Sequence, residues 1–188
     1  MYEDLIETKL ESENIFDGNL LHIKKDKVRL PNGSEAYREW VKHPGAAAVI
    51  PYTDKGEIVL VRQYRYPIDE VTLEIPAGKL DVAGEDPLEC AKRELSEETG
   101  YMANEYTYLT KLATSVGFSD EVIYIYAAKG LKAGKQHTDE DEFINVVKVP
   151  LTEAVKMVLD GRINDGKSIT AIFMLDRLIN NSNSPHDV

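Results

Sequence analysis

The stretch RELSEETG, residues 93–100, carries three glutamates within five positions: Glu94, Glu97 and Glu98. At about 100° per residue, a helix would place their side chains in an arc of roughly 100° beside its buried face. The arc lies in the last helical turn, where the helix dipole disfavours negative charge, so a surface helix gains nothing from it. A hard divalent cation does gain, because several carboxylate oxygens converge on it. This spacing favours a metal site over the alternative, a solvated acidic face with weak ion pairs to neighbouring basic residues.

The residues before this helix supply a second feature of a metal site. The segment LEIPAGKLD, residues 73–81, would end a strand and deliver a glycine-containing loop to the helix. Alanine and glycine leave the backbone uncovered, so the carbonyl of Ala77 could join the same metal. Mg²⁺ in such sites keeps several waters and shares substrate phosphates, and it can activate water and neutralise phosphoryl charge. We predict a Mg²⁺ site, with Mn²⁺ as an alternative, formed by Ala77, Glu94, Glu97 and Glu98.

The helix that holds the glutamates is predicted over residues 86–99, and the sequence signals both of its ends. Asp86 is a typical N-cap, Pro87 suits the first helical position, and Gly100 stands where a C-terminal glycine is favoured. Upstream, apolar runs predict buried strands over residues 46–52, 58–64 and 72–78.

Downstream, apolar runs predict strands over residues 121–130 and 142–150 and helices over residues 151–161 and 168–179. Thr152 is expected to cap the first of these helices and Gly161 to end it.

The N-terminal part of the chain is organised differently. Residues 15–43 predict a small antiparallel meander, with turns at Asp17-Gly18 and Asn32-Gly33. We expect an N-terminal antiparallel sheet in residues 1–43, the main domain in residues 44–180 and a disordered tail in residues 181–188.

Composition excludes several classes of protein. The chain has 188 residues, 43% of them hydrophobic, which is enough for one domain with an accessory element. The net charge of −11 argues against binding to nucleic acid and against docking on anionic membranes. The single cysteine, Cys90, excludes an internal disulfide framework and indicates a reducing compartment. No signal peptide and no apolar run of membrane-spanning length are evident, so we expect a cytoplasmic protein.

The segment GKLDVAGEDPLECAKRELSEETGY, from Gly78 to Tyr101, resembles the box of the Nudix hydrolases, G-x5-E-x7-R-E-U-x-E-E-x-G-U. Two positions depart from it: six residues instead of five separate Gly78 from Glu85, and Tyr101 fills a position that is more often aliphatic. The insertion bears on the role of Glu85 only. The resemblance implies an α/β fold, a Nudix α/β/α sandwich with a mixed sheet, and Arg93 as the residue that orients the glutamates.

The resemblance extends over roughly residues 15–160 through the segments DGNLLHIKKDKVRLPNGSEAYREWVKHPGAAAVIP, VLVRQYRYP and LEIPAGKL. With these segments the sequence resembles the ADP-ribose pyrophosphatase branch of that family. This implies a Mg²⁺-dependent enzyme that cleaves ADP-ribose to AMP and ribose 5-phosphate, and a homodimer whose N-terminal sheets contribute to base binding. Arg65 would then lie near the substrate phosphates, where a guanidinium can fork onto phosphate oxygens. The alternative for Arg65 and for Arg62 is ordinary charge on a strand surface.

The same resemblance assigns the remaining site residues. Phe16, Arg38, Glu39 and Trp40 would contact the base, although Phe16 and Trp40 also suit core or dimer packing. Glu142, or in second place Glu140, would orient or deprotonate the attacking water, although most acidic runs are solvated loops. Glu97 and Glu98 would be catalytic through the metal ions that they hold. Gly117 would line the substrate site in a loop where Val116 replaces the proline usual in this branch.

Three alternative functions remain open from the sequence. The first is hydrolysis of another nucleoside diphosphate sugar, such as UDP-glucose or GDP-mannose. The second is a sensor that binds ADP-ribose without cleaving it, although such proteins tend to lose the box glutamates that this chain keeps. The third is an acidic Ca²⁺-binding or structural domain, which ranks last because EF-hand spacing is absent.

Overall fold

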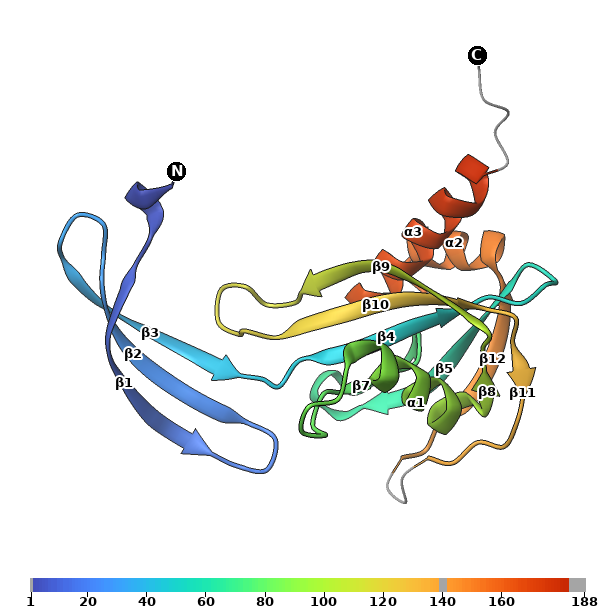
Figure 1. The fold of residues 1–188 in the computed structure, drawn as a ribbon, viewed down its shortest axis with the longest axis horizontal. Coiled ribbons are helices and arrows are strands. Elements are labelled where there is room, and N and C mark those ends of the chain that lie inside the picture. The colour runs from blue at the N-terminus through green and yellow to red at the C-terminus, as the bar shows by residue number, and fades with distance from the viewer. Residues whose placement is uncertain (1, 139–141, 183–188) are drawn as a thin grey trace, which may run out of the picture. The chain divides into compact units, whose positions relative to one another are not determined.

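The computed structural model describes residues 2–138 and 142–182. The chain divides into two compact units, each described here by itself: Met1–Gly45 with Ala113–Val122, and Ala46–Leu112 with Ile123–Val188. Figure 1 labels the elements of both units. The loop of residues 113–122 belongs to the first unit, which the sequence did not indicate.

The first unit is built on a three-stranded antiparallel sheet in the order β1-β2-β3. After a short 3-10 helix, η1 (Glu3–Leu5), its strands are β1 (Thr8–Asp17), β2 (His22–Arg29) and β3 (Glu35–Lys42). The predicted meander is confirmed, and Gly33 turns with a φ of 85° while the side chain of Asn32 accepts the N–H of Ser34 at 3.0 Å. β1 begins seven residues before the predicted start, because this acidic segment pairs with the lysine-rich β2.

The central sheet of the second unit has the order β7-β4-β10-β9. Its strands are β4 (Ala46–Pro51), β7 (Ala77–Lys79), β9 (Glu105–Ala113) and β10 (Val122–Lys129). β10 runs parallel to β4 and β7 runs antiparallel to it, so the predicted mixed sheet is confirmed. β9 was not predicted, because its exposed positions at the sheet edge are occupied by threonine, tyrosine and charged residues that give no apolar run.

A second antiparallel sheet has the order β12-β5-β6. Its strands are β5 (Glu57–Arg65), β6 (Glu70–Glu74) and β12 (Asn145–Pro150), and the 3-10 helix η2 (Tyr66–Ile68) joins β5 to β6. The single strand predicted over residues 72–78 is wrong: β6 and β7 lie in different sheets. Pro76 lies at the break, where its missing N–H cannot join a ladder, and its carbonyl accepts the N–H of Val49 at 2.9 Å. Two short strands, β8 (Tyr101–Met102) and β11 (Lys132–Ala133), form a separate pair.

The predicted boundaries of the first helix are confirmed. α1 (Pro87–Thr99) begins after Asp86, whose carboxylate accepts the N–H of Leu88 at 2.8 Å, and it ends at Gly100. Gly100 has a φ of 73°, the left-handed conformation that glycine adopts without steric cost.

The two later helices differ from the prediction at their starts. α2 (Leu151–Leu159) begins after Pro150 without a side-chain cap, so the capping role predicted for Thr152 is wrong. α3 (Gly166–Ser182) begins two residues early, because the carboxylate of Asp165 accepts the N–H of Ser168 at 2.9 Å and caps the helix there. α3 also extends through Ser182, two residues into the predicted tail, and residues 183–188 lie outside the described part of the chain.

β4 is buried along its whole length and separates two cores. One core contains Ala46, Ala48 and Ile50 of β4 together with Ala171, Ile172 and Leu175 of α3. The other contains Ala47 and Val49 of β4 together with Cys90, Ala91 and Leu95 of α1. Helices therefore cover both faces of the sheet, with α1 below β4 and α3 above it in the view of Figure 1. This confirms the predicted α/β/α sandwich.

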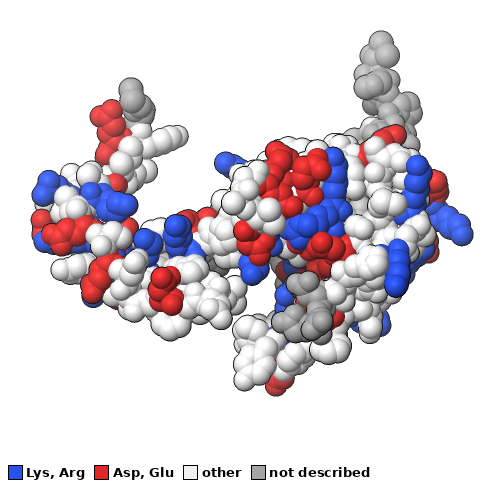
Figure 2. Space-filling view, turned by 60° about the horizontal axis from the view of Figure 1, so that its bottom comes forward, with Lys and Arg blue, Asp and Glu red and all other residues white. Residues whose placement is uncertain are grey.

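Acidic and basic residues lie interleaved over the larger unit on the face that Figure 2 shows, without a broad patch of one sign. Within residues 2–138 and 142–182, no helix is long and apolar enough to cross a membrane.

The glycine that ends α1 is expected to be required for stability. A Cβ on Gly100 would lie 2.7 Å from the backbone nitrogen of Gln136, in addition to the strain of the positive φ. We therefore expect Gly100→Ala to lower the free energy of unfolding by about 3 kcal/mol. The matched variant is Gly161→Ala, which has a φ of 82° but open space around the added Cβ, and it should cost only about 1 kcal/mol. Urea unfolding of both proteins checks the difference, and equal losses would contradict the steric argument.

Candidate active site

The packing of α1 determines where its glutamates lie. Cys90, Ala91 and Leu95 are fully buried against β4. Glu94 and Glu98 lie next to this face, one turn apart, and are only 9% and 4% exposed. The side chain of Glu97 is 41% exposed. Two of the three glutamates predicted to bind the metal are therefore buried carboxylates, which require a partner to remain charged.

The loop at β7 closes over these carboxylates. The N–H of Ala77 donates to Oε2 of Glu98 at 3.2 Å. A Cβ on Gly78 would lie 1.8 Å from Oε1 of Glu94, so only glycine lets this carboxylate lie against the loop backbone. The structure thus brings Ala77 together with Glu94 and Glu98, through the N–H of Ala77, whereas the predicted metal ligand is its carbonyl.

Arg93 connects the carboxylates of the site. Its Nε and Nη2 donate to the two oxygens of Glu85 at 3.0 and 3.1 Å. Its Nη1 donates to Glu94 at 2.6 Å and to Glu97 at 3.0 Å. Despite the extra residue in the loop, Glu85 still reaches Arg93, and Gly84 turns the chain there with a φ of 79°. Arg93 therefore holds the carboxylates of Glu85, Glu94 and Glu97 by hydrogen bonds.

The pKa values of the two buried glutamates are raised, so burial disfavours their charged forms. Burial, followed by the charges of Glu94 and Glu142, raises the pKa of Glu98 to about 8. Burial also raises the pKa of Glu94 to about 7, although Arg93 opposes this shift. A nearby cation would favour the charged form of both groups.

The donor set fits a hard divalent cation in its chemistry. Within the described residues, no three His, Cys, Asp or Glu side chains converge as a ready metal-binding group, and Arg93 lies against Glu94 and Glu97. The carboxylates of Glu94, Glu97 and Glu98 nevertheless offer only oxygen atoms, and two of them are buried. Oxygen donors of this kind are the ligands that Mg²⁺ and related ions prefer.

The segment before β12 lies beside the same carboxylates. The charge of Glu142 raises the pKa of both Glu94 and Glu98, which places this predicted catalytic residue near them. Glu140, the second candidate, lies outside the described residues.

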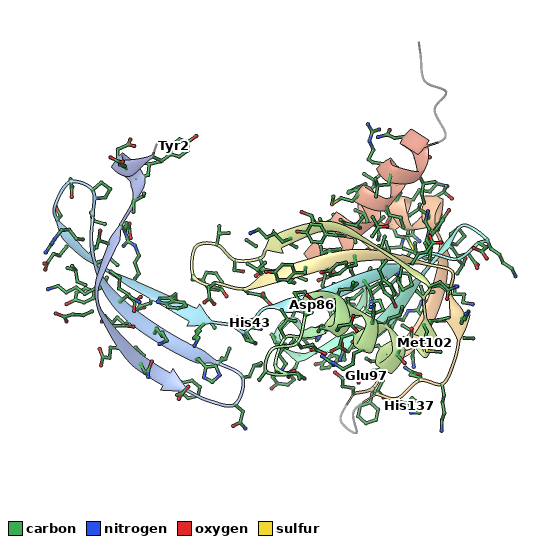
Figure 3. The ribbon with its side chains drawn as sticks, in the orientation of Figure 1. Tyr2, His43, Asp86, Glu97, Met102 and His137 are labelled. Carbon is green, nitrogen blue, oxygen red and sulfur yellow. The ribbon has the colours of Figure 1, made fainter. Side chains whose placement is uncertain are left out.

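This segment is attached to the last turn of α1. The side chain of Gln136 donates to the carbonyl of Glu98 at 2.7 Å, and the N–H of His137 donates to the carbonyl of Glu97 at 2.9 Å. Figure 3 shows Glu97 and His137 together at this end of the helix. Sequence reasoning missed Gln136, because an isolated glutamine in a loop gives no signal for this contact.

Arg65 is held by a buried partner that the sequence analysis did not identify. Its Nε and Nη2 each donate to one oxygen of Glu74 at 2.7 Å. The Glu74 side chain is 3% exposed and the Arg65 side chain 41% exposed. The negative charge of Glu98 is among the causes that raise the pKa of Arg65, so this arginine lies near Glu98. Arg62, in contrast, lies on an exposed position of β5.

The residues predicted to bind the base lie in the first unit. Phe16 is exposed on β1, and its ring leaves no room for a Cβ on Gly18. Nε of Arg38 donates to Glu7 at 2.9 Å, and Glu39 lies 4.0 Å from the ammonium of Lys25. A hydrogen bond from Trp40 is one cause, after that from Ser12, of the lowered pKa of Asp26.

Gly117 also lies in the first unit, in a turn that β3 supports. The N–H of Phe118 donates to the carbonyl of Ser115 at 3.0 Å, and the carbonyl of Phe118 accepts the N–H of Val41 at 2.8 Å. Val116, at the position where the branch usually has proline, is 81% exposed.

Gly78 offers a direct test of the site geometry. We expect Gly78→Ala to lower kcat for the hydrolysis that the resemblance implies about a hundredfold, because the new Cβ displaces the Glu94 carboxylate from the loop. The fold should persist, since the atom that must move is the end of a flexible side chain. Gly166→Ala is the matched control, because its Cβ meets open space. Steady-state kinetics and thermal unfolding of both proteins check this, and full activity of Gly78→Ala would contradict the placement of Glu94.

Comparison with family models and known proteins identifies the family of the chain. Residues 41–172 match the model described as NUDIX domain, and residues 7–41 match the model described as nucleoside diphosphate sugar hydrolase N-terminal domain. The chain is 46% identical over 168 residues to the methanol dehydrogenase activator of Bacillus methanolicus, covering 88% of this chain and 90% of that protein. It is 44% identical over 172 residues to the ADP-ribose pyrophosphatase of Bacillus subtilis (strain 168), covering 90% and 92%.

Two further similarities concern substrate class and fold. The chain is 39% identical over 135 residues to the GDP-mannose pyrophosphatase of Yersinia enterocolitica, covering 66% of this chain and 69% of that protein. A solved structure titled "Crystal structure of ADP compounds hydrolase" matches with a TM-score of 0.83 and 25% identity, covering 94% of this chain and 96% of that chain. The prediction made from the glutamate box is confirmed, and the chain belongs to the Nudix family of hydrolases.

Proposed function

We propose that this enzyme is a Mg²⁺-dependent pyrophosphohydrolase that cleaves ADP-ribose to AMP and ribose 5-phosphate. The observation that carries the proposal is the buried pair Glu94 and Glu98, held against the Ala77–Gly78 loop with raised pKa values. Such a pair could bind a divalent cation that also binds the diphosphate of a substrate. The similarity to ADP-ribose pyrophosphatase of Bacillus subtilis supports the choice of substrate.

In this proposal four residues hold the metal: the carbonyl of Ala77 and the carboxylates of Glu94, Glu97 and Glu98. When bound, Mg²⁺ supplies a lowered pKa for water and neutralises charge on the phosphoryl oxygens. Mn²⁺ is the alternative ion, because it accepts the same oxygen donors. Arg93 orients two of these carboxylates, those of Glu94 and Glu97, through the contacts described above.

The remaining side chains act on the water and on the substrate. Glu142 aligns the attacking water and accepts its proton, with Glu140 as the second candidate. The water oxygen forms a bond to one phosphorus, and the bond from that phosphorus to the bridging oxygen breaks, so that AMP and ribose 5-phosphate separate. Arg65 steadies the diphosphate oxygens with the part of its guanidinium that Glu74 leaves exposed.

We further propose how the rest of the chain contributes. The sheet of residues 1–43 would serve dimerisation and base binding through Phe16, Arg38 and Glu39, and Gly117 would line the substrate site. Residues 44–180 would form the hydrolase domain proper. The enzyme would act in the cytoplasm as a homodimer. It would not bind nucleic acid, because its net charge of −11 opposes binding to a polyanion.

A second candidate is the same reaction on another nucleoside diphosphate sugar. Two observations support testing GDP-mannose and UDP-glucose as substrates. The chain is similar to a GDP-mannose pyrophosphatase, and Val116 stands where the ADP-ribose pyrophosphatase branch usually has proline. A sensor that binds ADP-ribose without cleaving it is less well supported, because the three box glutamates are present.

Product analysis tests the proposal. The purified protein is incubated with Mg²⁺ and equal concentrations of ADP-ribose, UDP-glucose, GDP-mannose and NADH, and the nucleotides are resolved by chromatography. AMP formed fastest from ADP-ribose would support the proposal. Dominant UMP or GMP would keep the mechanism and change the substrate, with Val116 as the first residue to replace. Binding of ADP-ribose without any cleavage would indicate a sensor.

A further inference from the structure

A buried group of charges joins Arg65 to the start of α3. Lys167, in the first turn of α3, has a side chain that is only 10% exposed. Its ammonium contacts the carboxylate of Glu74 and lies 3.1 Å from Oδ2 of Asp165. A lysine is disfavoured in the first turn of a helix by the helix dipole, and it is costly to bury. Its presence there indicates that its contacts compensate for both effects.

The carboxylate of Glu74 is fully occupied. Oε1 accepts from Nε of Arg65 at 2.7 Å and from the hydroxyl of Thr72 at 2.5 Å. Oε2 accepts from Nη2 of Arg65 at 2.7 Å and from the ammonium of Lys167. Each oxygen thus uses two acceptor positions, which is the capacity of a carboxylate oxygen. Glu74 therefore has one orientation, and it transmits that orientation to Arg65.

Hydrogen bonds of the Asp165 and Ser168 side chains attach the start of α3 to the segment that follows Glu74. Oδ2 of Asp165 accepts both the N–H and the hydroxyl of Ser168, at 2.9 and 2.6 Å. The hydroxyl oxygen of Ser168 in turn accepts the N–H of Ile75, the residue after Glu74, at 2.8 Å in a buried position. The first turn of α3 is thus fixed to the end of β6, two residues before the Ala77 loop.

The charges in this group are balanced, and the balance depends on Lys167. Arg65 and Lys167 supply two positive charges, and Glu74 and Asp165 supply two negative ones. Without Lys167, the buried carboxylate of Glu74 would have Arg65 as its remaining cation and would hold that guanidinium more closely. The contact with Glu74 uses Nε and Nη2 of Arg65 and leaves Nη1 outside the pair.

We propose that Lys167 is a positioning residue for substrate binding. It shares the charge of Glu74 and fixes its carboxylate, so that the guanidinium of Arg65 keeps the orientation in which Nη1 meets the diphosphate. The inference rests on the proposed function, in which Arg65 binds the diphosphate of the substrate. Lys167 itself acts only through Glu74 and Arg65.

A double-mutant cycle tests this coupling. Lys167→Met, Arg65→Met and the double variant are compared with the wild type by steady-state kinetics on ADP-ribose with Mg²⁺. Each single variant should raise KM about tenfold and change kcat much less, because binding to the diphosphate is lost in the ground state and in the transition state alike. The double variant should resemble Arg65→Met alone, because Lys167 acts through Arg65. Lys156→Met, an exposed lysine of α2 whose side chain is 72% exposed, is the matched control and should behave like the wild type.

The outcomes separate the inference from the function on which it rests. A wild type that does not cleave ADP-ribose overturns both. An active wild type whose variants have additive effects overturns this inference alone. An active wild type whose Arg65→Met form keeps its KM overturns the inference and the proposed role of Arg65, but not the cleavage of ADP-ribose. Lys167→Gln, which keeps a hydrogen-bond donor toward Glu74, decides the question if Lys167→Met does not fold. Failure of both variants to fold would make Lys167 a residue of the fold and would also overturn the inference.

Discussion

Replacing Glu98 by glutamine is expected to lower kcat about a thousandfold while the protein remains folded. The amide has the size of the carboxylate, and its oxygen can still accept the N–H of Ala77. It has no charge to offer a divalent cation. In the absence of cations the variant should unfold at the same urea concentration as the wild type or higher, because burial raises the pKa of Glu98 to about 8 and disfavours its charged form. Turnover of ADP-ribose and urea unfolding with and without Mg²⁺ check both parts.

The control for this experiment lies on the same helix. Glu89 is exposed and paired with Lys92 at 2.7 Å, so Glu89→Gln changes charge equally without touching the site. Mg²⁺ should stabilise the wild type and the Glu89→Gln protein by mass action and should have little effect on Glu98→Gln. Near-normal turnover in a folded Glu98→Gln protein would contradict the metal site.

The part of the site that lies on one helix could be predicted because its geometry is local. A helix of known boundaries fixes the relative positions of Glu94, Glu97 and Glu98, and the caps at Asp86 and Gly100 defined those boundaries. The Ala77–Gly78 loop is adjacent in sequence, and the steric need for glycine beside Glu94 agrees with its predicted role.

The part of the site that depends on distant segments could not be predicted. Glu74 and Lys167 are 93 positions apart, and their contact exists because the start of α3 packs against the end of β6. One signal was nevertheless present in the sequence. A glutamate inside the apolar segment TLEIP and a lysine in the first turn of a helix are both unfavourable by themselves, so each implies a partner elsewhere in the fold.

The fold itself was predictable where apolar patterns are strong. β4 and β5 follow continuous apolar runs, and α1 follows the periodicity of a helix with one buried face. β9 carries no such run, and the break between β6 and β7 is visible only when Pro76 is treated as an obstacle to a continuous strand. The missed capping role of Asp165 shows that a good N-cap three residues before the apolar pattern can extend a helix beyond that pattern.

Acid is expected to reveal the strength of the interactions around Glu74. Contacts with Arg65 and Lys167 outweigh burial and lower the pKa of Glu74 to about 2 from a usual value of 4.5. A lowered folded pKa means that the stabilisation is present above pH 4.5 and is lost as the pH falls from 4.5 toward 2, because the unfolded state then binds the proton more readily. The loss should be about 3 kcal/mol for this group. Urea unfolding between pH 6 and pH 2.5 measures it.

Glu74→Gln isolates this contribution from those of other carboxylates. At pH 6 the variant should be less stable than the wild type, because Arg65 and Lys167 lose the charge that both contact. As the pH falls toward 2, the wild-type carboxyl becomes neutral like the amide, so the two stabilities should converge. Glu153→Gln removes a more exposed partner of Arg162 and should show a small difference that changes little with pH. A constant gap between wild type and Glu74→Gln over this range would mean that the charge of Glu74 does not stabilise the fold, and that packing alone holds α3 to β6.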